Sequence, residues 1–199
     1  MITRKEMTRM LLKEGLLSYL VNNSFESVTV TSLCKASGIT RSTFYLHYSN
    51  IMEIVDDLVD DAISYSRPGM VDNNNLQIIA KALSATSDSI SLREAYDSIF
   101  DRLPLCQRII RHKKYLPLFL DEQISEYVLQ RIIGSEKDRQ GLVMAEALGI
   151  SFDVGVSVFV FLVHGLYAIN KEYKWTQSDE WLEAQKVIFE LVYRGLQSK

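Results

Sequence analysis

The chain has 199 residues, of which 47% are hydrophobic, so it is long and apolar enough to bury a core and is not an intrinsically disordered segment. Apolar residues recur mainly at a spacing of three and four, and only 3 prolines and 9 glycines interrupt them, which predicts an all-α fold. The net charge of −3 is unevenly spread, because residues 1–50 carry six Lys or Arg and three Glu, leaving −6 for residues 51–199. The basic end is therefore the candidate for contacting an anionic partner.

The first nine residues carry charges and no apolar run with a cleavage site, so we expect no secretory signal and a cytoplasmic location. Cys34 and Cys106 lie in neither a metal-ligand nor a redox spacing, and we expect two small buried side chains, with no metal and no cofactor. The longest apolar stretch, Val154 to Ile169, is shorter than the roughly 20 residues of a membrane helix and contains His164. We expect a buried helix there and no membrane association.

The first quarter of the chain predicts three helices. The first runs from about Thr3 to Asn22, with an expected buried stripe of Met7, Met10, Leu11, Leu17, Leu20 and Val21. A short helix over 30–37 follows, with Thr29 as its N-cap and Gly38 as its left-handed end. Thr40 then caps a second short helix over 41–48. Two short helices joined by a tight turn form a helix-turn-helix, and both must pack on the first helix because neither is stable alone.

The remainder of the chain predicts further helices. One runs from Asn50 to about Ser66, with apolar residues on one side and Glu53, Asp56, Asp57, Asp60 and Asp61 on a side expected to be solvated. A loop is predicted over 66–75 because it contains Pro68, Gly69 and three consecutive asparagines. The later helices are expected near 76–87, 91–103, 104–114, 118–133, 142–148, 151–173 and 178–197. We predict a DNA-binding domain over 1–49 and a larger helical domain over 50–199, with 50–66 as a linking helix.

The second helix of the helix-turn-helix is the candidate recognition helix. Arg41, Ser42 and Thr43 in its first turn suit contacts to base edges or phosphates. Tyr45 and His47 suit phosphate contacts, which position a protein without selecting a sequence. The other candidate contacts are Thr29, Lys35 and Thr40, whereas Phe44 and Tyr48 are expected to face inward. The spacing alone fits an ordinary corner between two helices equally well.

The residue types favour DNA binding over that alternative. The run is Phe25-x-x-Val28-Thr29-Val30-x-x-Leu33-x-x-Ala36-Ser37-Gly38-Ile39-Thr40-Arg41-Ser42-Thr43-Phe44-Tyr45-x-His47-Tyr48. It closely resembles the DNA-binding signature of the tetracycline-repressor (TetR) family. The resemblance covers about a quarter of the chain and implies a homodimer, a palindromic double-stranded DNA operator, and repression that a small-molecule effector relieves. Two positions depart from the family pattern, because Ile51 stands where a phosphate-binding lysine is usual and Ser24 where glycine is common.

The stretch from Ser151 to Tyr173 is apolar nearly all round, and a single protomer can scarcely cover it. We predict that it and the last helix meet their symmetry mates in a four-helix interface, the alternative being an intramolecular core. Gly155 and Gly165 within the stretch indicate close helix packing. The predicted interface residues are Phe152, Val156, Phe159, Val163, Tyr167, Trp181, Ile188 and Val192.

An effector pocket is predicted from composition alone. Aromatic residues in the middle helices and a basic stretch over 108–114 suggest an aromatic-lined pocket for an anionic or aromatic compound. The alternative is a core of aromatic side chains beside a solvated basic corner. The candidate ligand-binding residues are Tyr96, Phe100, Arg111, Tyr115, Phe119, Tyr127 and Phe159.

The function predicted from these patterns is a TetR-like dimeric transcriptional regulator, a repressor controlled by a small molecule. An enzyme is not expected, because His47, His112 and His164 lie in unrelated segments, neither cysteine has an evident base, and no glycine-rich phosphate loop is present. The alternative within the same fold is a regulator-like protein that acts through a protein partner in place of a metabolite.

Overall fold

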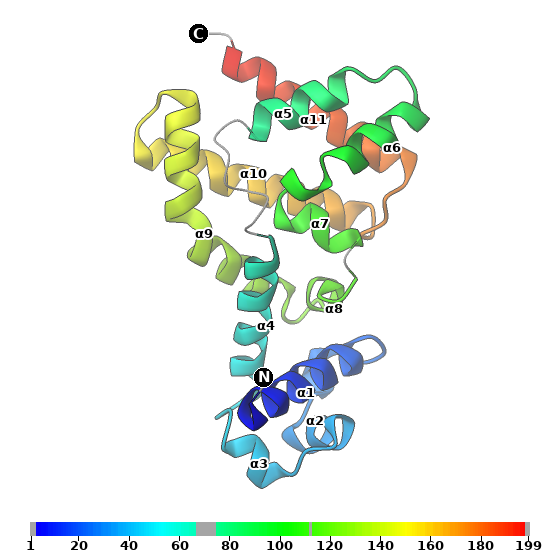
Figure 1. The fold of residues 1–199 in the computed structure, drawn as a ribbon, viewed down its shortest axis with the longest axis vertical. Coiled ribbons are helices and arrows are strands. Elements are labelled where there is room, and N and C mark those ends of the chain that lie inside the picture. Colours follow the sequence, from blue (N-terminus) through cyan, green and yellow to red (C-terminus); the bar gives the residue numbers. More distant parts are fainter. Residues whose placement is uncertain (1–2, 67–74, 112, 198–199) are drawn as a thin grey trace. The chain divides into compact units, whose positions relative to one another are not determined.

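A computed structural model describes residues 3–66, 75–111 and 113–197. These residues form eleven α-helices and two short 3-10 helices with no strand, which confirms the all-α prediction (Figure 1). The chain divides into two compact units, one formed by Met1–Ser64 with His112–Ile132 and the other by Tyr65–Arg111 with Ile133–Lys199. Most of the loop predicted over 66–75 lies outside the described residues.

The first unit holds the N-terminal helices and a later segment of the chain that packs with them. Its helices are α1 (Arg4–Leu20), η1 (Phe25–Ser27), α2 (Val30–Ser37), α3 (Arg41–Tyr45), nearly all of α4 (Ile51–Ser66), α8 (Leu116–Leu120) and the first third of α9 (Ser125–Leu148). Helix α1 packs against both α2 and α8. The helix that supports the helix-turn-helix therefore packs in turn against a segment far along the chain.

Helix α1 buries a different face from the one predicted. Its N-terminus forms a capping box between Thr3 and Glu6, and its fully buried side chains include Leu12 and Leu16. The predicted stripe is correct for Leu17 and Leu20 but wrong for the four residues that are more than a third exposed, Met7, Met10, Leu11 and Val21. Apolar residues occupy both faces of this helix, so their spacing could not identify the face that α2 covers.

The second unit is built from the remaining helices. They are α5 (Asn75–Ser84), α6 (Ser89–Ser98), η3 (Phe100–Arg102), α7 (Leu105–Arg111), the rest of α9, α10 (Phe152–Glu172) and α11 (Asp179–Gln197). Helix α11 packs on α5 and α6, and α10 packs on α7. At the centre Trp181 is fully buried, and its indole N–H donates a 3.0 Å hydrogen bond to Oδ1 of the buried Asn170. The Asn170 amide in turn donates to the carbonyl of Cys106, which joins α7, α10 and α11.

Helix α9 is one continuous helix where the sequence predicted two separate segments. The predicted interruption fell between 134 and 141, at two glycines, but the structure shows helix through both. Gly141 is required there by a close approach, because a Cβ atom on it would lie 2.4 Å from Cγ2 of Val156. A Cβ on Gly155 would likewise lie 2.3 Å from the Gly141 carbonyl oxygen, so α9 and α10 touch backbone to backbone. The close packing predicted for Gly155 is confirmed, whereas a Cβ on Gly165 would meet no atom within 4 Å.

The predicted helix over 118–133 is broken at Asp121. One carboxylate oxygen of Asp121 accepts hydrogen bonds from the amides of Gln123 and Ile124, and the other accepts the Phe25 amide at 2.6 Å. These bonds end α8 and start α9. The helices predicted over 41–48 and 91–103 are also shorter than expected, because each gives way to turns or to a 3-10 helix.

Helix α10 corresponds to the apolar stretch predicted to be buried. Within the described residues it is the one helix long and apolar enough to cross a membrane, judged by length and composition alone. Gly155, Phe159 and Leu166 are buried in the protomer, but Phe161 is 73% exposed and Val154 is 49% exposed. The prediction of a buried helix therefore holds for only one side of α10 in a single chain.

Candidate DNA-binding surface

The two short helices of the helix-turn-helix begin at the predicted residues, and α2 also ends where predicted, whereas α3 ends three residues early at Tyr45. Thr29 and Ser32 form a reciprocal capping box at the start of α2, with hydrogen bonds of 3.0 and 2.9 Å. Gly38 ends α2 at φ +66°, a left-handed conformation that glycine adopts without strain. The Thr40 hydroxyl accepts the Thr43 amide at 3.2 Å and so caps α3. These local features confirm the predicted N-caps and turn.

Helices α1 and α2 approach each other closely at Gly15. A Cβ atom at this position would lie 2.1 Å from Ser37 Oγ and 3.3 Å from its Cα. The Ser37 hydroxyl is also engaged, because it donates a 2.8 Å hydrogen bond to the Leu33 carbonyl. Because Gly15 has no side chain, α2 can lie this close to α1, the helix that supports it.

Helix α3 has one buried side and one exposed side. Phe44 is fully buried, and Tyr48, which follows the helix, is 3% exposed, as predicted. Their rings lie 6.3 Å apart between centroids. Opposite them, Tyr45 is 54% exposed and Leu46 80% exposed. The eight predicted DNA-contacting residues all lie at the surface: Thr29, Lys35, Thr40, Arg41, Ser42 and Tyr45 are exposed, and Thr43 and His47 are half-buried.

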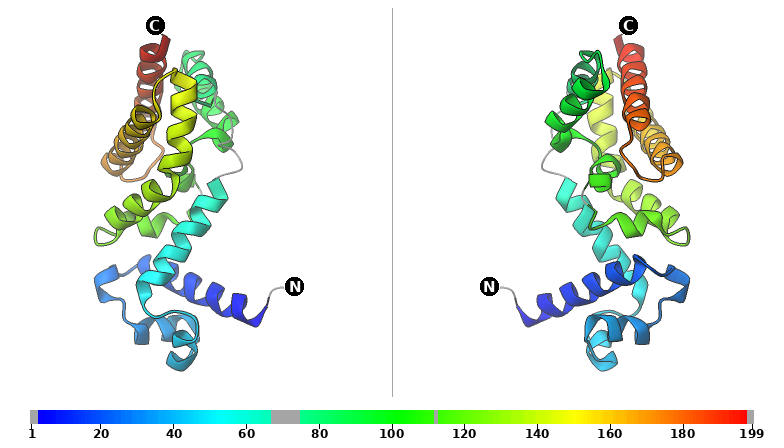
Figure 2. Two further views of the ribbon diagram at one scale, coloured as in Figure 1. Left: turned by 90° about the vertical axis from the view of Figure 1, so that its left-hand side faces the viewer. Right: turned by 90° about the vertical axis from the view of Figure 1, so that its right-hand side faces the viewer.

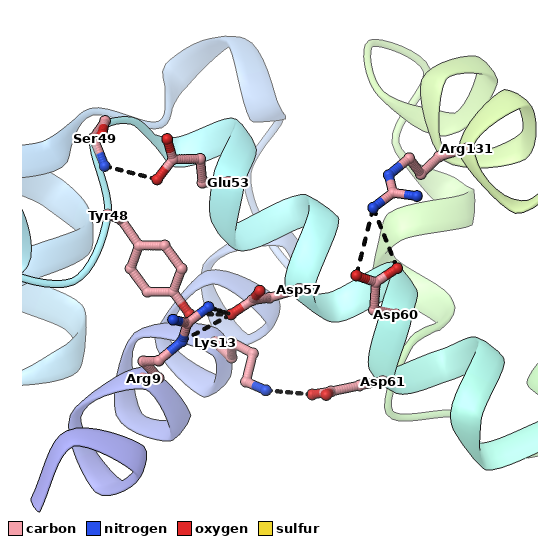
Figure 3. A network of polar contacts seen from close by, with 9 residues as sticks. All are labelled: Arg9, Lys13, Tyr48, Ser49, Glu53, Asp57, Asp60, Asp61 and Arg131. Carbon is pink, nitrogen blue, oxygen red and sulfur yellow. Dashed lines mark hydrogen bonds and ion pairs between the residues drawn. The ribbon is translucent and has the colours of Figure 1, made fainter. Parts of the chain in front are cut away.

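The cations of the first unit fall into two groups. Arg9 and Lys13, on α1, point to Asp57 and Asp61 on α4, with 2.5 Å between Lys13 Nζ and the Asp61 carboxylate (Figure 3). Within the described residues neither Lys35 nor Arg41 forms an ion pair. The charges of α2 and α3 are therefore available to an external anion, whereas those of Arg9 and Lys13 are largely neutralised.

Asp57 is the centre of the polar network shown in Figure 3. It accepts a 2.6 Å hydrogen bond from the Tyr48 hydroxyl and a 3.0 Å bond from Arg9 Nε, whose guanidinium also lies over the Tyr48 ring. Burial alone would raise the pKa of Asp57, but the hydrogen bonds from Arg9 and Tyr48 and the charges of Arg9 and Lys13 outweigh it, so the pKa is lowered. Burial and the bond to Asp57 raise the pKa of Tyr48. The carboxylate thus stays charged and joins α1, α4 and the end of the helix-turn-helix.

A second set of ion pairs covers the next turn of α4. Arg131 on α9 lies 3.2 Å from Asp56 and 3.3 Å from Asp60, measured from guanidinium nitrogen to carboxylate oxygen. The Tyr127 hydroxyl donates a 2.6 Å bond to Asp56, and this bond raises the pKa of Tyr127. The acidic side of α4, predicted to be solvated, is therefore an ion-paired surface. One signal for it was present, because Arg9 and Lys13 share the four-residue spacing of Asp57 and Asp61.

Side chains of nearby residues bond the backbone amides at the start of α4. Glu53 accepts the Ser49 amide at 2.8 Å, and Asn50 Oδ1 accepts the Glu53 amide at 3.1 Å. Ile51, at the first position of the helix, is half-buried. The Glu53 carboxylate therefore occupies one amide that a phosphate would otherwise approach, Asn50 Oδ1 occupies a second, and Ile51 supplies no positive charge.

The seven predicted ligand-binding residues are divided between the two units. Tyr115 and Phe119 are buried in the first unit, which also holds Tyr127. In the second unit Tyr96 is 1% exposed and packs edge-on against Trp181 at 5.2 Å between ring centroids. Arg111 pairs with Asp97 and covers the Phe100 ring, and Phe159 lines a small cavity. A groove of about 620 Å³ in the first unit is lined by none of the seven.

The predicted interface residues have different environments. Trp181 is fully buried, and Phe159 and Tyr167 are 6% and 5% exposed, so these three side chains belong to the core of the protomer and present little surface to a partner. Val156 is half-buried and packs on Gly141. The other four, Phe152, Val163, Ile188 and Val192, are exposed or half-buried.

Helices α10 and α11 are neighbours in the second unit and line one cavity together (Figure 2). Both helices leave apolar side chains exposed. On α11, Val187 is 53% and Leu191 is 69% exposed, and on α10 Phe161 is 73% exposed. Phe161, Gly165 and Ala168 are exposed at a helical spacing of four and three, so they share one face. Phe161, Val187 and Leu191 were not among the predicted interface residues, because both helices are apolar on several sides and the sequence does not show which side the protomer covers.

No protein-family model matches the chain, and no curated protein matches it. Among solved structures, it is similar to the TetR family repressor AlkX from Dietzia sp. strain DQ12-45-1b, a protein implicated in the biodegradation of n-alkanes. The two chains are 14% identical, the alignment covers 95% of each, and the TM-score is 0.41. The function is therefore argued from the residues and contacts of this chain.

Proposed function

We propose that this protein is a homodimeric, TetR-like transcriptional regulator that binds a palindromic operator as a repressor and is released by a small molecule. The observation that carries the proposal is the arrangement of α3. The buried Phe44 and, just after the helix, the buried Tyr48 anchor it to the first unit, and its outer residues include the exposed Arg41, Ser42 and Tyr45. A short helix held this way presents its first turn outward, which is how recognition helices meet the major groove.

The roles of the exposed side chains follow from their chemistry. Arg41 is a planar donor that can bond guanine through two N–H groups, and within the described residues it forms no ion pair that would compete. Tyr45 and Lys35 are suited to phosphate contacts, which contribute affinity without sequence preference. Thr29 and Thr40 use their hydroxyls as helix caps, so they act by orienting the helices toward DNA.

Dimerisation is supported by the uncovered apolar face of α10 and α11. A monomer seldom exposes a contiguous set of large apolar side chains such as Phe161, Val187 and Leu191. Two copies related by a two-fold axis would each cover the face of the other, and Gly165 would let the facing helices approach closely. A two-fold dimer also explains why the operator should be a palindrome, since each protomer reads one half-site.

Separate alanine substitutions test the assignment of the recognition helix. Arg41→Ala should lower affinity for the preferred duplex by roughly 5- to 150-fold, which corresponds to about 1–3 kcal/mol, and should relax preference at one base pair. Tyr45→Ala should weaken binding by the same factor for every duplex, preferred or scrambled, because a phosphate contact carries no sequence preference. Both are measured by fluorescence anisotropy on a preferred and a scrambled duplex.

Lys81→Ala, which removes an exposed charge from the second unit, is the matched control and should leave both affinities unchanged. If Arg41→Ala and Tyr45→Ala both bind each duplex like the wild type, α3 is not the recognition helix. In that case a regulator that acts through a protein partner becomes the better description of the fold.

A further inference from the structure

The second unit contains a partly enclosed cavity of about 60 Å³ between α9, α10 and α11. Its walls are almost entirely apolar and include Phe159, Leu166 and Phe189, which are all buried. The exception is Gln140 on α9, whose side chain is 4% exposed. The amide nitrogen of Gln140 is buried and has no hydrogen-bond partner among the described residues.

An unpaired amide at this depth is costly. A buried donor left without a partner loses its hydration and gains nothing in return, a penalty of about 1–3 kcal/mol. Such a group is uncommon in folded proteins and calls for a physical explanation. A bound molecule that offers one acceptor would supply the missing hydrogen bond.

Water is a poor candidate for that molecule. A buried water normally makes about three hydrogen bonds, and apolar cavities that lack polar partners stay dry. Here Gln140 is the one polar side chain in a wall otherwise made of aliphatic and aromatic residues, proline and Met144. A small apolar molecule with a single acceptor satisfies the amide and also contacts the rest of the wall.

We propose that this cavity binds a small, uncharged, mainly aliphatic compound with one carbonyl oxygen, which accepts a hydrogen bond from Gln140. A cavity of about 150 Å³ holds benzene, so 60 Å³ encloses roughly two to three heavy atoms, such as a carbonyl group and one neighbouring carbon, and the rest of the compound would extend through the open side. The cavity and Gln140 carry the binding proposal by themselves. The further idea that this compound is the effector rests on the proposed function.

Two probes of the same shape test the site on the full-length protein. They are 2-butanone and 2-methyl-1-butene, in which a CH₂ group replaces the carbonyl oxygen. NMR spectra follow the Gln140 side-chain amide and the Met144 methyl group during titration. We expect saturable shifts at both residues and an affinity for the ketone about tenfold higher than for the alkene, because only the ketone supplies an acceptor.

Gln140→Leu keeps the size of the side chain and removes the amide. The ketone should lose its advantage over the alkene, and the melting temperature should rise by about 2–4 °C because an unpaired buried amide has been removed. Gln130→Leu, an exposed position on the same helix, is the control and should change neither.

The proposal is overturned if saturating ketone shifts neither signal, as would happen if a side chain of a second copy fills the cavity. Equal affinities for the two probes, or a lower melting temperature for Gln140→Leu, would overturn it too. DNA binding is measured separately. A protein that binds the ketone but no DNA contradicts only the proposed function, whereas one that binds DNA but no ketone contradicts only this inference.

Discussion

Asp57 holds three segments of the first unit together through one carboxylate. It pairs with Arg9 from α1, accepts the hydroxyl of Tyr48 from the end of the helix-turn-helix, and itself belongs to α4. Its side chain is 26% exposed, so water screens these interactions only in part. The orientation of α3 on its support therefore depends on a charged group well behind the proposed DNA-binding surface.

Replacing Asp57 by asparagine should lower the free energy of unfolding by about 1–3 kcal/mol at pH 7, since hydrogen bonds to a charged group are lost. The folded pKa of Asp57 is lowered, so its contribution is fully present above the unfolded pKa, about 3.9, and is lost as pH falls through the folded value. The difference between wild type and variant should thus shrink below about pH 4. Denaturation followed by circular dichroism at pH 7 and pH 3 measures it.

Asp60→Asn is the matched control, because Asp60 pairs with Arg131 but its side chain is 55% exposed. Exposed pairs contribute roughly 0–1 kcal/mol, so this variant should be nearly as stable as the wild type at both pH values. A pH-independent loss in Asp57→Asn would show that shape rather than charge accounts for its effect.

Ile51 permits a prediction in the opposite direction. The TetR resemblance implies a phosphate-binding lysine at this position, whereas Ile51 is half-buried and the nearby Ser49 amide is bonded to the Glu53 carboxylate. Ile51→Lys should strengthen binding to all duplexes and add about one to the slope of log affinity against log salt. Titrations at two or more salt concentrations measure the slope.

Ile51→Gln is the control for side-chain length without charge. It should leave the slope at the wild-type value. An unchanged slope in Ile51→Lys would place the start of α4 away from the DNA backbone.

The roles of these residues could be predicted from the sequence only where their partners lie a few positions away. Thr29, Gly38 and Thr40 could be assigned because caps and left-handed turns depend on neighbours a few positions away. The pairing of Arg9 with Asp57 joins residues 48 positions apart, and only the packed helices bring them together. The ligand residues were predicted from composition, which carries no information about position, and the structure divides them between two units.

Among the helices, α10 and α11 show the largest difference between what the protomer buries and what it exposes. Their inner sides include Phe159, Leu166, Trp181 and Phe189, which are less than a tenth exposed. Their outer sides remain apolar rather than becoming charged, as an ordinary surface helix would. A helix pair with two apolar sides is expected to have a second partner outside its own chain.

Phe161→Glu combined with Leu191→Glu should convert a dimer into a monomer, because association would bury four unpaired carboxylates per dimer. Size-exclusion chromatography with light scattering gives the mass directly. The helical signal in circular dichroism should be retained, since both side chains are largely exposed in the protomer.

Ile90→Glu on α6 is the control, because Ile90 is 73% exposed, as is Phe161. It should remain dimeric. A wild-type protein that elutes as a monomer at micromolar concentration would contradict the proposed interface outright.

For the molecule as a whole, the distribution of charge agrees with the proposal that the N-terminal residues bind DNA and the later residues do not. Residues 1–50 carry +3 and residues 51–199 carry −6. Because Arg9 and Lys13 are paired with Asp57 and Asp61, the positive charge left for DNA lies mainly on Arg4, Lys5, Lys35 and Arg41. The affinity for DNA should therefore depend only modestly on salt concentration, because few free cations are left to contact phosphates. The sequence preference should come from the first turn of α3.

The most direct test of the proposed function is to select bound duplexes from a random pool with the purified full-length protein, at two salt concentrations. We predict enrichment of a palindrome whose half-site centres are one helical turn apart, or a small multiple of it, with fewer non-specific sequences retained at the higher salt. A pool that stays random at both concentrations would contradict operator binding by the protein without effector.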